Sequence, residues 1–211
     1  MIFAILPVKD PRNAKQRLKD YLAPEERETL ARLLYRQTLA ALLQAEGIDR
    51  VVVVTSDPDV AEYARGSGVI VFEEEEQLSH SASADAACLR VMEMGATTAM
   101  LVPIDVPRVT PDDFKELAAA ARPGLIVVPS SDGTGTNALV RTPPNVIESR
   151  FGPGSFRAHM DQARAKGVYG EALRLPGLMF DIDTPEDVAE LLTSERDGPV
   201  SAFLRSTCAS K

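Results

Sequence analysis

Residues 125–140 read LIVVPSSDGTGTNALV and hold a glycine loop between two apolar runs. Within the loop, Gly133, Gly135 and Ala138 match the G-x-G-x-x-A spacing of a dinucleotide-binding fingerprint. That fingerprint requires a helix directly after the glycines, whereas NALV predicts a strand. The loop also lies late in the chain, and no acidic residue ends a strand about twenty residues further on. We therefore favour either a plain tight turn or a loop whose backbone amides and threonine hydroxyls bind a small anion.

The other apolar runs predict an α/β fold with a mostly parallel central sheet flanked by helices. We expect strands at residues 2–6, 51–55, 69–72, 99–103 and 125–129. Helical patterns lie between them, at residues 24–46, 57–66, 82–95 and 110–122. Continuous apolar strands suit a sheet that helices cover on both faces. The regular alternation of strand and helix predicts a doubly wound order.

The second half of the chain departs from this alternation. We expect a strand, a helix, one or two short strands and two further helices, at residues 137–141, 154–167, 173–183, 184–192 and 198–205. There is no internal repeat, low-complexity segment or linker composition to mark a boundary. We therefore expect a single domain over residues 1–211.

The overall composition argues against several classes of protein. A net charge of −8 disfavours non-specific nucleic-acid binding, because such binding depends on neutralising phosphates with Lys and Arg. No apolar run approaches the length of a membrane span, and the opening MIFAILPVKD is too short and too soon charged for a signal peptide. Cys88 and Cys208 have no metal-ligand spacing and are typical of free thiols. We expect a cytoplasmic protein that binds neither nucleic acid nor a membrane.

A basic segment, PVKDPRNAKQRL at residues 7–18, follows the first predicted strand. It gathers four cations into an acidic chain, namely Lys9, Arg12, Lys15 and Arg17. A loop at the carboxyl end of the first strand faces the ligand crevice of an open sheet. Lys and Arg at that place would neutralise a polyphosphate. The alternative is a solvated surface loop with no ligand.

Three carboxylates follow predicted strands. Asp105 lies in PIDVP, after the run at residues 99–103, and Asp181 and Asp183 lie in FDIDTP. Alternate residues of a strand point the same way, so Asp181 and Asp183 can face one site. Carboxylate oxygens suit Mg²⁺, which usually takes one or two protein carboxylates together with phosphate oxygens and waters. Each Asp alone could instead be a helix cap or a turn residue.

These segments occur in one order together with FGPGSFRAH at residues 151–159. In that order they resemble the guanylyltransferase family that activates 2-phospho-L-lactate, or a related phospho-acid, in making coenzyme F(420). The resemblance extends from about residue 2 to residue 193. It implies a Rossmann-like, GT-A-like nucleotidyltransferase fold. It also implies that GMP passes from GTP to a small phospho-acid (2-phospho-L-lactate, phosphoenolpyruvate or 3-phospho-D-glycerate), with release of pyrophosphate.

The resemblance also implies roles for matching residues. Those expected at the nucleotide are Pro7, Val8, Lys9 and Lys15. Apart from the resemblance, we expect Ser79 and Ser83 at the base or ribose of the nucleotide. Those expected to be catalytic are Lys15, Arg17 and Asp105. Those expected at the acceptor are Thr134, Gly135, Thr136, Asn137, Gly152 and Ser155. The Mg²⁺ ligands would be Asp105, Asp181 and Asp183.

One segment departs from the family pattern. The family often carries Gly-Leu-Asn at the start of the third helix, where EEEEQLSHSASADAA at residues 73–87 places His80 or Ser81. We interpret the glutamates at residues 73–76 as a solvated loop, and His159 as an ordinary surface residue. The alternatives are an enzyme of the same fold with a sugar phosphate or molybdopterin acceptor, and a non-catalytic nucleotide-binding protein. The apolar residues of SAFLRS, residues 201–206, suggest a homodimer contact.

Overall fold

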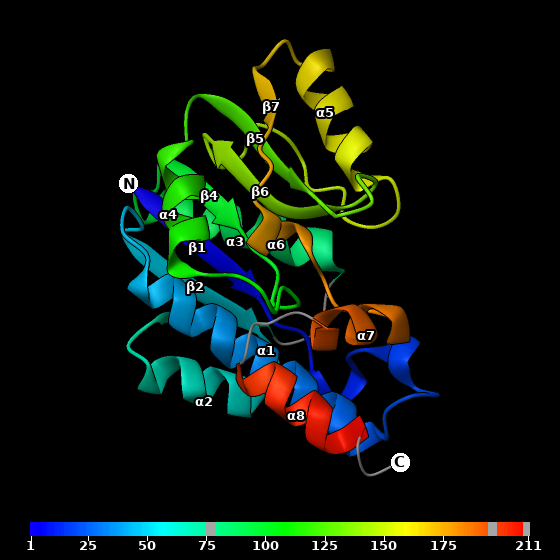
Figure 1. Ribbon diagram of the computed structural model, residues 1–211. Helices are drawn as coiled ribbons and strands as arrows, with labels where there is room; N and C mark the ends of the chain where they lie inside the picture. Colours follow the sequence, from blue (N-terminus) through cyan, green and yellow to red (C-terminus); the bar gives the residue numbers. More distant parts are fainter. Residues whose placement is uncertain (75–78, 194–197, 209–211) are drawn as a thin grey trace.

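The computed structural model describes residues 1–74, 79–193 and 198–208. In these ranges a seven-stranded sheet has the order β3-β2-β1-β4-β6-β5-β7 (Figure 1). The strands are β1 (Ile2–Pro7), β2 (Arg50–Thr55), β3 (Ile70–Glu73), β4 (Thr98–Leu101), β5 (Gly124–Pro129), β6 (Thr136–Thr142) and β7 (Gly170–Ala172). Only β6 runs against its neighbours, β4 and β5. The predicted mostly parallel α/β sheet is confirmed.

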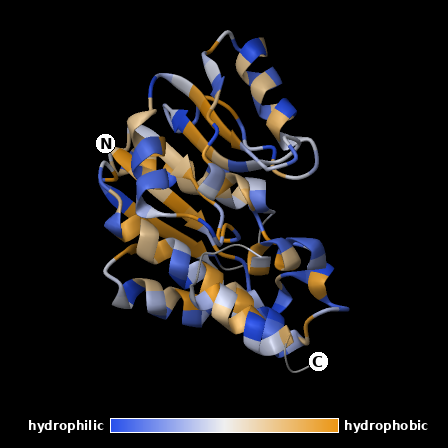
Figure 2. Ribbon diagram, in the orientation of Figure 1, coloured by the Kyte–Doolittle hydropathy of each residue, from blue (hydrophilic) through white to orange (hydrophobic). Residues whose placement is uncertain are grey.

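Helices cover both faces of the sheet, as predicted from the continuous apolar runs (Figure 2). One face packs against α1 (Pro24–Gln44), α2 (Pro58–Gly66), α4 (Pro111–Ala119) and α6 (Pro176–Met179). The other packs against α3 (His80–Glu93) and α5 (Ser155–Ala165). In β1, Ala4 and Leu6 face the first layer, and Phe3 and Ile5 face the second. A fully buried leucine such as Leu6 contributes about 1.5–3 kcal/mol.

A third apolar cluster lies beside the sheet and is called the edge core here. It joins the basic segment, the start of α1, the segment before α7 (Pro185–Thr193), α7 itself and α8 (Pro199–Cys208). Its buried members are Leu18, Leu22, Leu30, Leu34, Phe180, Ile182, Val188, Leu191, Val200 and Leu204. Figure 1 shows α8 alongside α1, with α7 next to it. The edge core therefore anchors the two segments that carry the predicted basic and acidic site residues.

The C-terminal helix uses part of the predicted dimer surface inside the molecule. Leu204 of α8 is fully buried in the edge core, and Phe203 is half-buried against it. Leu204 therefore cannot supply the proposed contact with a second copy, and the homodimer stays a prediction. Within the described ranges, no helix is long and apolar enough to cross a membrane.

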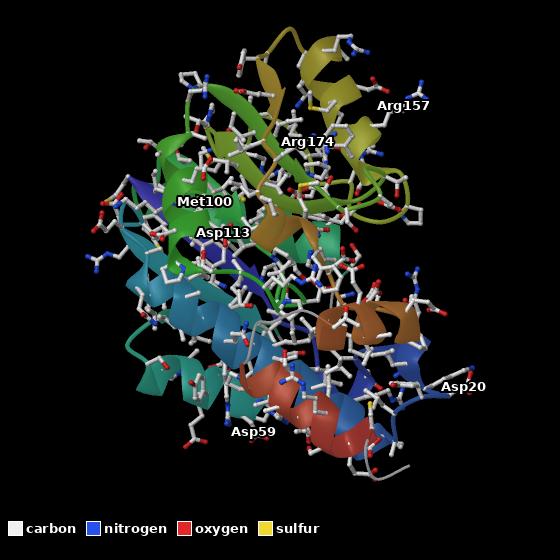
Figure 3. All side chains as sticks on the ribbon, viewed as in Figure 1. Asp20, Asp59, Met100, Asp113, Arg157 and Arg174 are labelled. Atoms are coloured by element: carbon white, nitrogen blue, oxygen red, sulfur yellow. The ribbon has the colours of Figure 1, made fainter. Side chains whose placement is uncertain are left out.

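The prediction of short strands at residues 173–183 is wrong. The strand β7 ends at Ala172, and residues 176–179 form the short helix α6. Pro176 explains the difference, because it lacks the N–H that a strand needs and fits the first turn of a helix. A side chain at Gly177 would collide with the carboxylate of Asp113 in α4, which is labelled in Figure 3.

Gly124→Ala should destabilise the protein strongly, while Gly66→Ala should not. Gly124 has a φ of 117°, and an added Cβ would lie 2.9 Å from the Cβ of Tyr169 and against its carbonyl oxygen, where β5 pairs with β7. We expect a loss of about 3 kcal/mol from the strained backbone and the collision together. At Gly66 in α2 an added Cβ meets no atom within 4 Å, so alanine should stabilise by about 0.5–1 kcal/mol. Urea unfolding of both variants measures the difference, and equal stabilities would contradict the prediction.

Candidate active site

The candidate site lies at the carboxyl ends of β1 and β4. Asp105 follows β4, and its carbonyl oxygen accepts a hydrogen bond of 3.0 Å from the backbone N–H of Ile182. Phe180 and Ile182 are buried in the edge core, so the alternate residues Asp181 and Asp183 face the other way and stay partly exposed. The two carboxylates therefore share one side, as the sequence predicts, although the segment that carries them is irregular rather than a strand.

Lys15 joins the two carboxylate segments. Its side chain is only 6% exposed, and its Nζ donates to Asp105 Oδ2 at 3.2 Å and to Asp183 Oδ1 at 3.0 Å. Burial disfavours the charged ammonium, but the attraction of Asp105 and Asp183 outweighs it, and the pKa of Lys15 is raised. Lys15 also has a left-handed backbone, with a φ of 53°, which is uncommon for a residue with a side chain. Such strain is often found at functional sites.

The carboxylates differ in their electrostatic surroundings. Burial raises the pKa of Asp105, but the Lys15 ammonium outweighs this effect and holds that pKa below its ordinary range. The pKa of Asp181 is raised, first by burial and then by repulsion from Asp105 and Asp183, with an opposing hydrogen bond from Asn137. Lys15 therefore compensates Asp105 and Asp183 but does not contact Asp181. A further cation beside Asp181 would relieve this repulsion.

The donor set fits a magnesium ion that is shared with a nucleotide. Among the described residues, no three carboxylate, imidazole or thiol groups lie close enough together to bind one ion by themselves. Mg²⁺ does not need such a cage, because it usually binds one or two carboxylates and completes its octahedron with phosphate oxygens and waters. Asp105 and Asp183 meet at the Lys15 ammonium, and Asp181 lies near enough to both for their charges to raise its pKa. Their role as metal ligands stays a prediction.

The rest of the basic segment is arranged around Lys15 in two short 3₁₀ turns, η1 (Pro11–Asn13) and η2 (Gln16–Leu18). Arg17 lies 3.6 Å from Asp183 and is 72% exposed, so its guanidinium is free to reach a ligand. Lys9 is exposed as well, whereas Arg12 pairs with Asp10 at 2.8 Å. Pro7 and Val8 are buried, and the N–H of Val8 donates to the Val54 carbonyl. The exposed positive charge of the segment therefore comes from Lys9 and Arg17, while Lys15 is buried between Asp105 and Asp183.

The glycine loop is built around the carboxylate of Asp132. Asp132 accepts hydrogen bonds from the Ser130 hydroxyl at 2.5 Å and from the N–H and hydroxyl of Thr134 at 2.9 and 2.8 Å. These bonds lower the pKa of Asp132 to about 2, the one from Ser130 contributing most. Ser130 Oγ in turn accepts from the N–H of Gly135 at 2.7 Å. A Cβ on residue 135 would lie 2.9 Å from this oxygen and collide with it. The second glycine therefore permits this internal packing of the loop.

Asn137 connects the glycine loop to the carboxylates. It is the extra residue of a β-bulge, because Val128 and Pro129 of β5 pair with Ala138 and Thr136. Its buried Nδ2 lies 2.9 Å from the carbonyl oxygens of Leu178 and Met179 and 3.1 Å from Asp181 Oδ1. The amide nitrogen of Asn137 therefore holds Asp181 and the end of α6 against the loop.

The two predicted acceptor segments meet as expected. The N–H of Phe156 donates to the Thr134 carbonyl at 3.2 Å, and the N–H of Ser155 donates to the Gly152 carbonyl at 3.1 Å. Gly152 has a φ of 121°, in a region open to glycine, and Ser155 is 2% exposed. The glycine loop and the segment before α5 are thus side by side. Their binding of an acceptor stays a prediction.

His159 lies between these segments, and its interpretation as a surface residue is wrong. It is fully buried, with Nδ1 3.0 Å from Thr136 Oγ1 and Nε2 accepting from the N–H of Arg150 at 2.8 Å. Ser155, His159 and Ala163 form the buried face of α5 at a spacing of four residues. That spacing was a signal in the sequence, since the same helix projects Arg157 into solvent (Figure 3).

The start of α3 contacts the site through a residue without a predicted role there. His80 packs edge-on to Phe151, with ring centroids 4.6 Å apart, and Ser81 Oγ accepts from the N–H of Phe151 at 3.0 Å. The pKa of His80 is lowered by burial, while the charge of Asp105 opposes that shift. Ser79 Oγ caps α3, and Ser83 is 5% exposed. Ser79 is exposed, and its oxygen accepts from the N–H of Ala82, which leaves its hydrogen to donate. The predicted binding of the nucleotide by Ser79 and Ser83 stays a prediction. Two of the predicted loop glutamates, Glu75 and Glu76, lie outside the described residues.

An ion pair between a buried arginine and a half-buried aspartate fixes the segment before Gly152. Arg141 is 1% exposed and donates to Asp85 Oδ1 at 2.8 Å and to the Ile147 carbonyl at 2.7 Å. Asp85 also accepts from the N–H and the hydroxyl of Ser149. This network was not predicted, because nothing in the sequence indicates that Arg141, in an apolar strand, pairs with Asp85, in a helix.

The sequence of the chain matches a known protein family. The model of the family described as "Guanylyl transferase CofC like" matches residues 2–210. The chain belongs to this family. It is 39% identical to the phosphoenolpyruvate guanylyltransferase of Sphaerobacter thermophilus over 89% of this chain and 91% of that protein. It is 31% identical to the 2-phospho-L-lactate guanylyltransferase of Methanothermobacter thermautotrophicus over 96% of this chain and 89% of that protein.

Solved structures share the fold of this guanylyl transferase family member. A protein of Desulfovibrio desulfuricans described as a nucleotide-diphospho-sugar transferase has a TM-score of 0.80 at 16% identity, over 99% of this chain and 95% of that one. A Mycobacterium tuberculosis protein in complex with manganese has a TM-score of 0.58 at 20% identity, over 92% of this chain and 98% of that one. The predicted nucleotidyltransferase fold is confirmed.

The burial of His159 predicts a pH dependence of stability. Burial, followed by repulsion from Arg141, lowers the pKa of His159 from the ordinary 6.5 to about 4, while Asp85 opposes the shift. Below pH 6.5 the imidazole of His159 binds a proton in the unfolded chain, whereas in the folded chain it stays neutral until the pH approaches 4. Stability is therefore lost as the pH falls from 6.5 towards 4, by about 3 kcal/mol for this group.

Urea unfolding of wild type and His159→Phe between pH 7 and pH 4 measures this contribution. Phenylalanine cannot titrate, so the stability gap between the two proteins should narrow as the pH falls. Parallel pH profiles would contradict the assignment of a neutral, buried imidazole.

Proposed function

We propose that the protein transfers GMP from GTP to a small phospho-acid and releases pyrophosphate. The observation that carries the proposal is the 3.1 Å contact between Asn137 Nδ2 and Asp181 Oδ1. It joins the glycine loop, proposed to bind the acceptor, to the cluster of Lys15, Asp105, Asp181 and Asp183, proposed to bind the nucleotide. The membership of the chain in the guanylyl transferase family supports the same reaction.

The proposed GMP transfer requires alignment of the reactants and neutralisation of their charges, and it does not require a strong base. A phosphate oxygen of the acceptor attacks the α-phosphorus of GTP, so that an O–P bond forms while the bond from the α-phosphorus to the bridging oxygen of pyrophosphate breaks. The nucleophile is already an anion at neutral pH, and no proton has to be removed. The described site matches this demand, because burial disfavours the protonated form of both imidazoles near it, His80 and His159.

The roles of the residues follow from their charges. Arg17 and Lys9, both exposed, would neutralise the triphosphate, and Lys15 would hold Asp105 and Asp183 in place beside it. Mg²⁺, when held by Asp105, Asp181 and Asp183 together with phosphate oxygens, supplies further neutralisation of the triphosphate. In the glycine loop the Thr136 hydroxyl would receive an anionic oxygen of the acceptor, because the N–H and hydroxyl of Thr134 and the N–H of Gly135 already donate within the loop.

We propose phosphoenolpyruvate or 2-phospho-L-lactate as the acceptor ahead of 3-phospho-D-glycerate. The 39% identity to a phosphoenolpyruvate guanylyltransferase supports phosphoenolpyruvate, whereas the 31% identity to a 2-phospho-L-lactate guanylyltransferase gives that acid no separate advantage. A 3-phospho-D-glycerate guanylyltransferase of Colwellia psychrerythraea is 30% identical, over 97% of this chain and 96% of that protein. We further propose that the reaction belongs to coenzyme F(420) biosynthesis, which the sequence resemblance implies.

Pyrophosphate release from GTP and Mg²⁺ tests the proposal, with the three phospho-acids in parallel and ATP as the nucleotide control. We expect release with GTP and one of the acids. Asp105→Asn should lower kcat by about 100-fold or more, because it removes charge from the reacting site. Asp20→Asn is the matched control, because Asp20 is exposed and lies away from the site (Figure 3). Unchanged turnover in Asp105→Asn, or silence of the wild type with every acid, would contradict the proposal.

A further inference from the structure

His159 connects the two walls of the proposed acceptor site through one imidazole ring. On one side Nδ1 lies 3.0 Å from Thr136 Oγ1 in the glycine loop. On the other side Nε2 lies 2.8 Å from the backbone nitrogen of Arg150, two residues before Gly152. The ring is fully buried between the two segments. The proposed reaction uses no proton from His159, so its contacts need another explanation.

The contact with Arg150 determines where the ring carries its hydrogen. A backbone N–H can only donate, so Nε2 must accept and must be unprotonated. A neutral imidazole then carries its hydrogen on Nδ1. Consequently Nδ1–H donates to Thr136 Oγ1, and the hydroxyl acts as the acceptor in that contact.

The neutral form is the one that the surroundings favour. The ring lies edge-on to Phe151, with centroids 5.4 Å apart, within α5, whose residues Ser155 and Ala163 are also buried. Of the charged groups near it, Arg141 lowers the pKa of His159 and Asp85 raises it, while burial lowers it most. With the charge state settled, the directions of both hydrogen bonds are settled too.

The direction of the bond matters for Thr136. Because its oxygen accepts from Nδ1–H, the hydrogen of the hydroxyl is left to donate elsewhere. Thr136 is half-buried at the start of β6, directly before Asn137, whose Nδ2 contacts Asp181. A hydroxyl that offers its hydrogen at this place is suited to an anionic oxygen, since hydrogen bonds to charged groups are the stronger ones.

We propose that His159 is a positioning residue, which holds the Thr136 hydroxyl through Nδ1–H so that this hydroxyl donates to an anionic oxygen of the phospho-acid. The proposal rests on the proposed function for the identity of that ligand. His159 does not touch the ligand itself. It acts through Thr136, and the N–H of Arg150, which donates to Nε2, keeps the hydrogen of the ring on Nδ1.

Two substitutions of His159 separate the two hydrogen bonds. The amide of His159→Asn can place an N–H near the position of Nδ1, whereas the amide of His159→Gln can place an oxygen near the position of Nε2. Each variant keeps one bond and loses the other, so a merely structural role predicts similar effects. A positioning role predicts that His159→Gln raises the acceptor KM by about tenfold or more, with little change in the GTP KM, and that His159→Asn stays close to wild type.

A double-mutant cycle with Thr136→Val decides whether His159 acts through the hydroxyl. Thr136→Val alone should raise the acceptor KM to a similar extent as His159→Gln, and Thr136→Ser should restore most of the affinity. Adding His159→Gln to Thr136→Val should cause little further loss. Three results would overturn the proposal: losses of acceptor affinity that multiply in the double variant, an unchanged acceptor KM in Thr136→Val, or equal effects of the Asn and Gln variants. If the wild type still turns over, the proposed function is unaffected by these results.

Failure of the proposed function has a different signature, namely no pyrophosphate from the wild type with any of the three acids. In that event ¹⁵N NMR of the His159 imidazole shows which ring nitrogen carries the hydrogen, and so tests whether His159 positions the Thr136 hydroxyl. A protonated Nδ1 whose signal moves in Thr136→Val supports it. A protonated Nε2 overturns it.

Discussion

The ammonium of Lys15 lies 3.2 Å from Asp105 Oδ2 and 3.0 Å from Asp183 Oδ1, with its side chain almost wholly buried. Each carboxylate comes from a different part of the chain, and without the cation their charges would repel one another across the carboxyl edge of the sheet. Because Lys15 compensates only two of the three aspartates, the surroundings of Asp181 remain short of positive charge. In the proposed function, a metal–nucleotide complex would supply the positive charge that Asp181 lacks.

The cluster also depends on apolar anchoring behind it. Leu18 follows Lys15 in the basic segment, and Phe180 and Ile182 flank Asp181; all three side chains are buried in the edge core. The charged residues therefore stay at the surface of a packed cluster, without moving freely as loop residues would. Asn137 adds the link to the glycine loop, so the nucleotide and acceptor halves of the proposed site share one rigid frame.

The sequence predicts the fold and the outline of the site well, for physical reasons. Buried parallel strands leave continuous apolar runs, and chemistry-bearing residues gather at their carboxyl ends, so Lys15 and Asp105 could be found without a structure. Pairing between distant residues leaves no such pattern. The Asn137 bulge, the Arg141–Asp85 pair and the buried side of His159 depend on which elements pack together, and helix α6 replaced predicted strands because Pro176 outweighed the local apolar run.

In the proposed function, the three carboxylates at this edge bind a divalent metal together with GTP. Electron paramagnetic resonance of Mn²⁺, titrated with GTP present, tests it directly when wild type is compared with Asp181→Asn. We expect a saturable protein-bound signal in the wild type and a loss of affinity of about tenfold or more in the variant, since Asp181 is the carboxylate that lacks a cation. Equal Mn²⁺ binding by the two proteins would contradict the proposed metal site.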